Sequence, residues 1–463
     1  MEKKERAEIQ HSRVKLKVLI AGAGVGGLSA AIALARRGHD VTVFEQAEKL
    51  AEVGAGIQVP PNSLRMLLEW GLAEFLQGWT TEPHNVYFRR WQDGKIIGRT
   101  RYIPDFREKF DAPYYVIHRA HLHHALKELA QKYGVAIKLA SRIIAVDAVA
   151  GSLQTQDRNA YFGDLIVAAD GIHSGLRGSI FGGQAKPSPT GFVAYRCTVN
   201  TEEMVRDSTT ASLLRSPNLN LWVGEDGHVM SYPISGGNSF NVVVNRYDPS
   251  DPASWNRSDA LEEMKTIISD WDAVLIKLVG MVKHTEKWPL LQVSTLQNWV
   301  CERAVILGDA AHAMLPYMSQ GAAIAVEDAA ALAEAIHLIS AEDQVPHTLK
   351  VWETVRRLRA HEMQQASELN SVLWHFADGP EQEARDASME AEVDGRQIID
   401  SSANQWSDGA TQRWCYAYDC EEEIRRAWMV QKQTCDDEDL DAEWRDSAYV
   451  SRATSIAAVE LDR

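Results

Sequence analysis

The sequence contains little cysteine, no excess of positive charge and no long hydrophobic run. Its five cysteines are scattered among 463 residues, odd in number and without a C-x-x-C pair. This pattern argues against a disulfide framework and fits a reducing compartment. The formal net charge of −16 argues against a nucleic-acid partner.

The two ends of the sequence carry no recognisable targeting signal. The start, MEKKERAEIQHSR, is too charged for the apolar core of a signal peptide, and the last residues match no peroxisomal or ER signal. No uninterrupted apolar run is long enough to span a membrane. We therefore expect a cytoplasmic protein, a monomer or a homodimer, with neither a membrane nor a nucleic-acid partner.

The stretch KLKVLIAGAGVGGLSAAIALARRGHDVTVFE, residues 15–45, contains the pattern around which the chain is organised. A short apolar run precedes Gly22, Gly24 and Gly27, and an amphipathic helix pattern follows them. In a β-α-β unit these glycines allow a tight turn, close approach of a pyrophosphate, and close packing of helix on strand. Glu45 is placed to accept hydrogen bonds from an adenosine ribose, and its charge disfavours a 2′-phosphate. The resident dinucleotide is therefore expected to be FAD or NAD.

Two later stretches favour FAD. The sequences DLIVAADGIHSGLR (residues 164–177) and AVILGDAAHAMLPYMSQGAA (residues 304–323) each read as a buried strand with an acidic residue next to glycine at its end. Ligands bind at that end of strands in open α/β sheets. Asp309 could accept hydrogen bonds from the ribityl chain of a flavin. Gln320 and Gly321 open a long helix pattern, whose N-terminus would stabilise the negative charge of a reduced flavin.

Together these motifs resemble those of class A flavoprotein monooxygenases, the group that includes salicylate hydroxylase and fungal phenol hydroxylases of polyketide pathways. The resemblance covers about residues 15–376 and rests on the glycine motif, on Asp170-Gly171 and on Gly308-Asp309-Ala310-Ala311-His312. Family members usually carry proline after this histidine, whereas this chain has Ala313, which we expect to loosen the turn. The resemblance implies no metal and the following FAD-binding residues: Gly22, Gly24, Gly27, Glu45, Gly56, Arg119, Asp170, Asp309, Pro316, Gly321 and Ala322.

The same resemblance implies a single-component enzyme that hydroxylates a small phenolic substrate with O2. Only one G-x-G-x-x-G occurs, so NAD(P)H is expected to visit the flavin transiently as a co-substrate. Reduced flavin and O2 would give a C4a-hydroperoxide with an electrophilic distal oxygen, from which the protein must exclude water. The product would be a catechol, or a dearomatised quinol of fungal secondary metabolism where the attacked carbon carries a methyl group.

Arg196 and Tyr232 are the expected catalytic residues. They lie in AYRC and MSYP, on strands of an antiparallel sheet that the alternating pattern predicts. Fungal dearomatising phenol hydroxylases look as though they place an arginine and a tyrosine on these strands. A guanidinium can lower the pKa of a phenol, and a tyrosine hydroxyl can bind the same oxygen. The alternative is that Arg196 is a surface or ion-paired residue and that Tyr232 is a core aromatic.

These features predict an α/β fold with a Rossmann-type FAD-binding domain like that of p-hydroxybenzoate hydroxylase, an inserted antiparallel sheet and a helical C-terminal region. The expected divisions are residues 1–83, 112–188 and 286–380 for the FAD-binding domain, 84–111 and 189–285 for the substrate-binding sheet, and 381–463 for the C-terminal region. Helical patterns occupy residues 255–281, 322–340 and 348–376.

Other aromatic and histidine residues favour structural interpretations. The tail contains four scattered tryptophans that are expected to be packing residues: Trp406, Trp414, Trp428 and Trp444. Four histidines lie in one expected helix, but no cysteine or carboxylate cluster nearby completes a zinc site: His118, His121, His123 and His124. We therefore expect these histidines to lie on a solvated helix face.

Two other functions remain open. A flavin-dependent epoxidase of a non-aromatic alkene would use the same cofactor, but its sheet should lack a cation at the flavin, so Arg196 favours a phenol. A flavin-binding interaction protein would use the acidic tail as its partner surface. Stimulation of NADPH consumption by phenols would distinguish an enzyme from such a protein.

Overall fold

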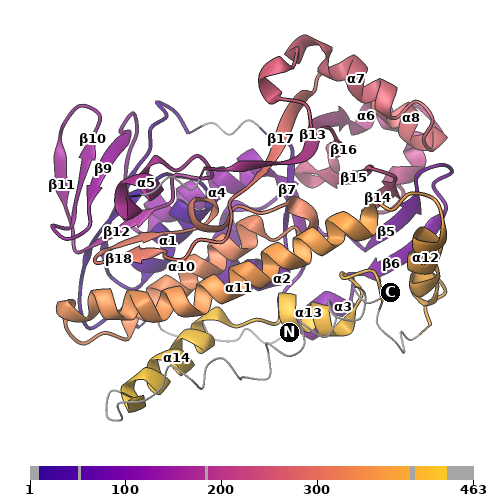
Figure 1. Cartoon of the computed structure of the whole chain (residues 1–463). Coiled ribbons are helices and arrows are strands. Elements are labelled where there is room, and N and C mark those ends of the chain that lie inside the picture. Colours follow the sequence, from indigo (N-terminus) through magenta and orange to yellow (C-terminus); the bar gives the residue numbers. More distant parts are fainter. Residues whose placement is uncertain (1–9, 51–53, 183–185, 397–401, 435–463) are drawn as a thin grey trace.

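The computed structural model describes residues 10–50, 54–182, 186–396 and 402–434. Its central layer is a six-stranded sheet in the order β18-β19-β12-β1-β2-β8, in which only the β18-β19 pair is antiparallel (Figure 1). Its strands are β1 Lys17–Ala21, β2 Asp40–Phe44, β8 Ala136–Lys138, β12 Leu165–Ala168, β18 Val300–Cys301 and β19 Ala304–Ile306. The apolar residues of β1 and β12 are almost fully buried, as expected of parallel strands with both faces covered.

Helices pack around this sheet, and the longest lies across the front of the molecule in Figure 1 as the orange α11. The helix α1 packs against both α4 and α10, and α10 packs in turn against α2 and α11. The bounds of these helices are α1 Val25–Arg36, α2 Pro61–Glu69, α4 Arg119–Lys132, α10 Gly321–His337 and α11 Val345–Trp374. The helices expected over residues 322–340 and 348–376 are therefore confirmed within a few residues of their ends.

A second, seven-stranded sheet has the order β17-β13-β16-β15-β14-β5-β6. Its strands are β5 Asn85–Arg90, β6 Ile96–Arg101, β13 Ser188–Asn200, β14 Leu219–Gly224, β15 Gly227–Ile234, β16 Ser239–Tyr247 and β17 Glu286–Gln292. The predicted sheet is thus present and is antiparallel except for the parallel β5–β14 pair, and it extends beyond residue 285 to include β17. The division of the chain into domains stays a prediction.

The two faces of this second sheet differ, because side chains alternate along each strand. Its outer face packs against α7 (Ala260–Ile267) and α8 (Ala273–Gly280), the pink helices at the upper right of Figure 1. The expectation of a single helical span over residues 255–281 is wrong, because two separate helices, α7 and α8, occupy this range. Asp272 separates the two helices because its side chain caps α8 at the Val274 N–H and accepts a hydrogen bond from Trp222 Nε1 at 2.8 Å.

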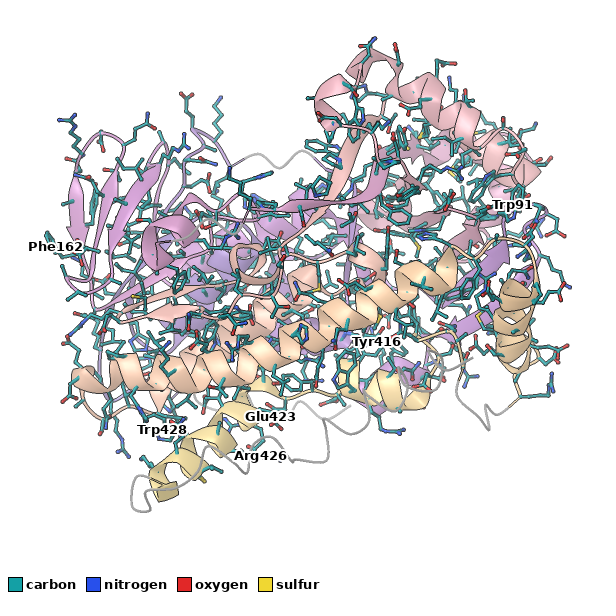
Figure 2. The ribbon with its side chains drawn as sticks, in the orientation of Figure 1. Trp91, Phe162, Tyr416, Glu423, Arg426 and Trp428 are labelled. Carbon is teal, nitrogen blue, oxygen red and sulfur yellow. The ribbon has the colours of Figure 1, made fainter. Side chains whose placement is uncertain are left out.

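Smaller elements complete the described chain. One three-stranded sheet joins β3 Gly56–Val59, β7 Tyr115–His118 and β4 Thr80–Thr81. Another joins β11 Ala160–Phe162, β10 Ser152–Thr155 and β9 Ile143–Asp147, and Figure 2 marks Phe162 on its outer strand. The remaining helices before the C-terminal region are α3 Asp105–Phe110, α5 Gly175–Phe181, α6 Thr201–Val205 and α9 Asp309–His312.

Three helices of the C-terminal region pack against the rest of the described chain. They are α12 Pro380–Val393, which packs on β6, α13 Gly409–Tyr416, which packs on α2, and α14 Cys420–Thr434, which packs on α10 and α11. Figure 2 marks Glu423, Arg426 and Trp428 on α14. Trp406 and Trp428 are buried as expected of packing residues, and Trp414 is partly buried against the core. Trp444 and the acidic run at residues 436–439 lie outside the described residues.

The described residues offer neither a membrane-spanning helix nor a metal cluster. No helix among them is long and apolar enough to cross a bilayer, and no group of three or more His, Cys, Asp or Glu could hold a metal ion. The expectation that four histidines lie on a solvated helix face is wrong for His123, which is buried with its Nε2 2.6 Å from the Ala23 carbonyl oxygen. The four cysteines in this part of the chain are free thiols, and Cys435 lies outside it.

Two acids on α10 and two arginines on α11 form a buried ionic network. Arg356 Nε lies 2.8 Å from Asp328 Oδ1, and Arg356 NH2 lies 2.9 Å from Glu327 Oε2. Arg359 NH2 lies 3.2 Å from Glu327 Oε1. None of the four residues is more than 3% exposed. Removing one partner would therefore leave an uncompensated charge in the core.

We expect Arg356→Met to lower the free energy of unfolding by about 3–5 kcal/mol, because Asp328 and part of Glu327 lose their counter-charge. The measurement is the urea midpoint of the purified protein. Arg426→Met is the matched control, since Arg426 pairs with Glu422 and Glu423 on an exposed face of α14. Its effect should stay within about 0.5 kcal/mol. Equal midpoints for the two variants would contradict a structural role for the network.

Candidate functional site

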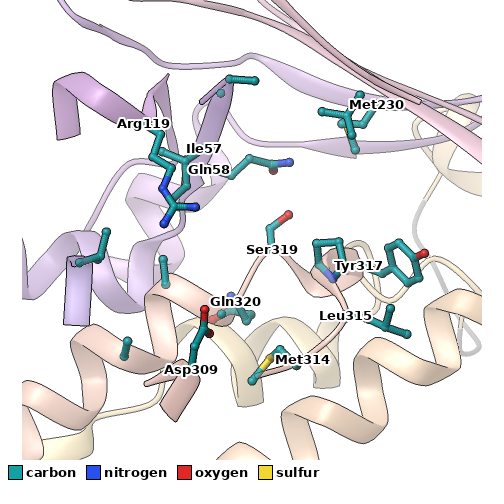
Figure 3. Close-up of a pocket in the computed structure, with 18 of the residues that line it drawn as sticks. Ile57, Gln58, Arg119, Met230, Asp309, Met314, Leu315, Tyr317, Ser319 and Gln320 are labelled. Carbon is teal, nitrogen blue, oxygen red and sulfur yellow. The ribbon is translucent and has the colours of Figure 1, made fainter. Parts of the chain in front are cut away.

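A cavity of about 340 Å³ opens between the first glycine turn, the inner face of the seven-stranded sheet and the loop at residues 314–320. Figure 3 shows Arg119 and Gln58 on one side of it, Met230 on the sheet, and Asp309 near the loop. Most of the residues predicted for the site line this cavity: Gly56, Arg119, Arg196, Tyr232, Asp309, Pro316, Gly321 and Ala322. The others, at the glycine turn and the ends of β2 and β12, lie outside the lining.

The glycine turn between β1 and α1 requires its glycines for different reasons. Gly22 has a φ of +101°, and a Cβ there would lie 2.3 Å from the Ala169 carbonyl oxygen. A Cβ on Gly27 would lie 2.0 Å from the Gly22 carbonyl oxygen. At Gly24, in contrast, no atom lies within 4 Å of the Cβ position. Gly22 and Gly27 therefore close the turn onto β12 and α1, while Gly24 leaves its backbone open to a ligand.

Two acids predicted to bind the dinucleotide hold the local backbone in this structure. Glu45 accepts hydrogen bonds from the Ala23 and Ala47 N–H groups, both at 2.9 Å. Asp170 accepts from the Ser174 hydroxyl at 2.6 Å and the Leu176 N–H at 3.2 Å. Each carboxylate fixes a loop beside the glycine turn. Their contacts with the dinucleotide stay predictions.

The opposite side of the cavity is formed by the chain after β19. Asp309 begins α9 and exposes its side chain to the cavity. Ala313 has a φ of −51° and a ψ of 131°, which are values that proline also adopts, so the turn keeps a proline-like path. The helix α10 begins after Gln320, as predicted, and the Gln320 side-chain oxygen accepts a hydrogen bond from Asn62 Nδ2 at 2.8 Å. This bond fixes the start of α10 at the cavity wall.

Arg196 and Tyr232 reach the cavity from the inner face of the sheet. Arg196 on β13 pairs with Val243 on β16, and Val243 pairs with Met230 on β15, so the three side chains form one row. Tyr232 lies two residues further along β15. Burial and the nearby Arg119 lower the pKa of Arg196, which Tyr232 opposes, whereas burial raises the pKa of Tyr232. Tyr232 therefore remains a hydrogen-bond donor. The Arg196 side chain lines the cavity but is exposed, so its role as an anchor rather than a surface arginine stays a prediction.

Sequence reasoning missed His228 and Asn245, which line the same face. His228 Nε2 lies 2.9 Å from Asn245 Nδ2, and His228 Nδ1 lies 2.7 Å from His375 Nε2. Strand alternation from Tyr232 places Met230 and His228 on the same face of β15, so this pattern could have identified His228 as a cavity residue. No signal in the sequence locates His375, which reaches the sheet from the end of α11.

Aromatic side chains close the His228 end of the cavity. Tyr317, Trp374 and Trp406 line it, and the His228 ring lies 4.9 Å from Tyr317 and 5.1 Å from Trp374 between centroids. Trp374 and Trp406 meet edge-on at 5.4 Å. Trp406 thus belongs to the site as well as to the core, because the C-terminal region places it there.

Comparisons with known proteins agree with this geometry. A family model described as "FAD binding domain" matches residues 15–367. The FAD-dependent monooxygenase OpS4 of Beauveria bassiana (strain ARSEF 2860) is 35% identical over 88% of this chain and 96% of its own. A 3-hydroxybenzoate 6-hydroxylase of Polaromonas naphthalenivorans (strain CJ2) is 32% identical over 80% of this chain and 90% of its own. A salicylate hydroxylase substrate complex has a TM-score of 0.73 and 25% identity, covering 90% of this chain and 98% of that one.

The described residues fit FAD. The open backbone at Gly24 suits a pyrophosphate, and Gly171 and Gly321 likewise have no atom within 4 Å of their Cβ positions. The carboxylate of Asp309 faces the cavity, where the hydroxyls of a ribityl chain are good donors to it. The N-terminus of the 17-residue α10 opens onto the same space.

We expect acid to destabilise the fold through the histidine pair. Burial lowers the pKa of His228 well below its usual range and that of His375 to about 3. The unfolded chain binds these protons from about pH 6.5 downward, so the stabilisation is fully present above that pH and falls towards pH 3. The slope is about 1.4 kcal/mol per pH unit for each histidine.

Urea midpoints at about pH 7.5 and about pH 5 measure this slope. His375→Gln should make the loss on acidification smaller, because one of the two titrations disappears. His124→Gln, on an exposed part of α4, is the control and should leave the loss unchanged. An unchanged loss in His375→Gln would show that the pair does not control acid stability.

Asp309→Ala should bind FAD about tenfold or more weakly while keeping its fold, because a ribityl hydroxyl would lose its acceptor. Fluorescence titration of the apoprotein with FAD measures this, and circular dichroism checks the fold. Asp309→Asn keeps a side-chain oxygen acceptor and should retain more affinity. Unchanged affinity in Asp309→Ala would refute this placement of the ribityl chain.

Proposed function

Because the chain belongs to the FAD binding domain family and is a flavoprotein monooxygenase, we propose that it uses NAD(P)H and O2 to hydroxylate a small phenol. One observation carries the proposal. Arg196 is the only permanently charged side chain that the seven-stranded sheet contributes to the described cavity, which Asp309 also lines. An arginine so placed favours an ionised phenol, the form that reacts best with an electrophilic oxygen.

The names of relatives support an aromatic substrate. Those of Streptomyces platensis and Polaromonas naphthalenivorans (strain CJ2) are a 3-amino-4-hydroxybenzoate 2-monooxygenase and a 3-hydroxybenzoate 6-hydroxylase. Both names describe hydroxylation of a ring that already carries a hydroxyl group. The chain accordingly acts as an FAD-dependent aromatic hydroxylase.

Different residues of the cavity have different roles in the proposed reaction. Arg196 holds the phenol oxygen and stabilises its negative charge, and Tyr232 donates a hydrogen bond to the same atom. Bound FAD would supply the redox chemistry that delivers one oxygen atom of O2. His228 takes no proton from the substrate, because its two ring nitrogens are already engaged by Asn245 and His375. The phenol proton therefore passes to solvent water, and Arg196 favours this loss by stabilising the phenolate.

The substituent on the attacked carbon decides the product. With the phenol oxygen fixed at Arg196 and Tyr232, the ortho carbon is the one presented to the incoming oxygen. A hydrogen on that carbon leaves as the ring regains aromaticity, giving a catechol. A methyl group cannot leave, so the product is a dearomatised quinol. The guanidinium also disfavours the alternative of an alkene epoxidase, which needs no anion at that position.

We expect Arg196→Ala to lose product formation while still binding FAD, because the phenol is then neither ionised nor fixed. Arg196→Lys should recover little, since a point charge does not reproduce the planar fork. Tyr232→Phe should retain part of the activity, with a loss of about 1–3 kcal/mol in transition-state stabilisation.

Product formation and uncoupled peroxide release are measured for each variant. Arg246→Ala is the control, because Arg246 lies on the same sheet but bonds the exposed Glu225 carbonyl. Full coupled turnover in Arg196→Ala would refute the phenolate anchor. No phenol-stimulated NAD(P)H consumption by the wild type would instead favour a flavin-binding interaction protein.

A further inference from the structure

We propose that the substrate is a phenol without a carboxylate, so that the cavity selects neutral phenols over the matching hydroxybenzoates. The inference rests on the proposed function and concerns the part of the substrate remote from Arg196. It comes from the charges and hydrogen bonds of the His228 end of the cavity, which the proposed reaction does not use.

The cations of the described cavity lie together. Three residues of its lining carry a formal charge: Arg119, Arg196 and Asp309. His228 also lines the cavity and would be charged only if protonated. Arg119 is close enough to Arg196 to lower its pKa, so both guanidinium groups serve the same region. A substrate that gives its phenol oxygen to Arg196 therefore meets no second cation further along the sheet.

The inner face of the sheet shows how far the neutral region extends. Tyr232, Met230 and His228 succeed one another on the cavity side of β15, at a rise of about 3.3 Å per residue. Tyr232 lies at the Gly56 end, where a Cβ on Gly56 would overlap its ring at 2.5 Å. His228 therefore lies about 13 Å away along the strand. Both ends line the cavity, and only the first has a cation in its lining. Arg246 and Arg385 lie near His375, behind His228, and neither lines the cavity.

His228 presents no positive charge to this region. Its ring nitrogens bond Asn245 and His375, and two imidazoles can share one hydrogen bond only if one donates and the other accepts. The Asn245 amide nitrogen can only donate, so Nε2 accepts and Nδ1 carries the proton that is donated to His375. In this arrangement the His228 ring is neutral, and the low pKa of both histidines keeps it so near neutral pH.

The rest of the wall is aromatic or aliphatic. Tyr317, Trp374 and Trp406 close the end, with Met230 and Val243 beside them on the sheet. Burial raises the pKa of Tyr317, so its hydroxyl stays protonated. A methyl, acyl or fused-ring substituent buries apolar surface against this wall. A carboxylate would lose its water and find no cation in this wall, only uncharged donors: the Tyr317 hydroxyl and the indole N–H groups of Trp374 and Trp406.

The test compares pairs of compounds that differ only in this group. Suitable probes are 3-methylphenol with 3-hydroxybenzoate, and 3,5-dihydroxytoluene with 3,5-dihydroxybenzoate. The holoenzyme should consume NAD(P)H with a kcat/KM about tenfold or more higher for the neutral member of each pair. Perturbation of the flavin absorbance in the absence of NAD(P)H gives an independent measure of binding. Equal or higher values for the acids would overturn the inference.

A charge placed in the wall sharpens the test. Met230→Arg puts a guanidinium between Arg196 and the aromatic end, and it should lower the neutral-over-acid ratio about tenfold or more. Met230→Leu has a similar volume and no charge, so it should keep the wild-type preference. FAD content checks that both variants are folded. An unchanged ratio in folded Met230→Arg would overturn the inference.

The two proposals fail in different ways. Preference for the hydroxybenzoates with coupled product formation would leave phenol hydroxylation intact and remove only the neutral-substrate inference. Failure of every phenol, neutral or acidic, to stimulate NAD(P)H consumption or perturb the flavin spectrum would overturn the proposed function and the inference with it.

Discussion

Two adjacent carboxylates on α10, Glu327 and Asp328, connect the segments on which the cavity depends. Asp328 Oδ2 lies 2.6 Å from His312 Nε2 and accepts from the Gly308 N–H at 3.3 Å, which fixes the loop that carries Asp309. Glu327 accepts from Asn62 Nδ2 at 2.7 Å, and the same nitrogen bonds the Gln320 side chain at the start of α10. Buried ion pairs add little net stability. Their consequence here is geometric, because each acid has one arrangement that satisfies its partners.

The C-terminal region is part of this arrangement. Arg359 pairs with Glu327 and also donates to the carbonyl oxygens of Trp414 and Cys415, both at 2.9 Å. The segment that precedes α13 carries Trp406 into the cavity wall. Through Glu327 and Asn62, this arginine therefore links Gln320 at the start of α10 to the chain that closes the aromatic end. The region whose role the sequence leaves unassigned completes the site from the side opposite the glycine turn.

Local patterns predict the parts of the site that depend on neighbouring residues in the chain. The G-x-G-x-x-G spacing predicts the turn at Gly22 because the turn's geometry depends on a few consecutive residues. The alternation of apolar and polar residues predicts that Arg196 and Tyr232 lie on strands. What the sequence does not reveal is which distant elements meet: His375 against β15, and Trp406 against α11. Those contacts depend on how helices pack on sheets, and single aromatic residues carry no record of their partners.

The two ends of the cavity differ in chemistry, and they also differ in whether local sequence patterns identify their residues. The cationic end consists of residues that the family motifs and the strand pattern identify, and under the proposed function its charge would favour the ionised form of a phenol. The far end consists of side chains from β15, α11 and the C-terminal region, and its neutrality follows from a hydrogen-bond constraint rather than from composition. Two imidazoles sharing a bond cannot both be charged, and Asn245 engages the nitrogen that would otherwise face a ligand. Under the proposed function, a charge at one end and a neutral wall at the other would hold the phenolate oxygen at Arg196 and the uncharged remainder of the substrate against the aromatic wall.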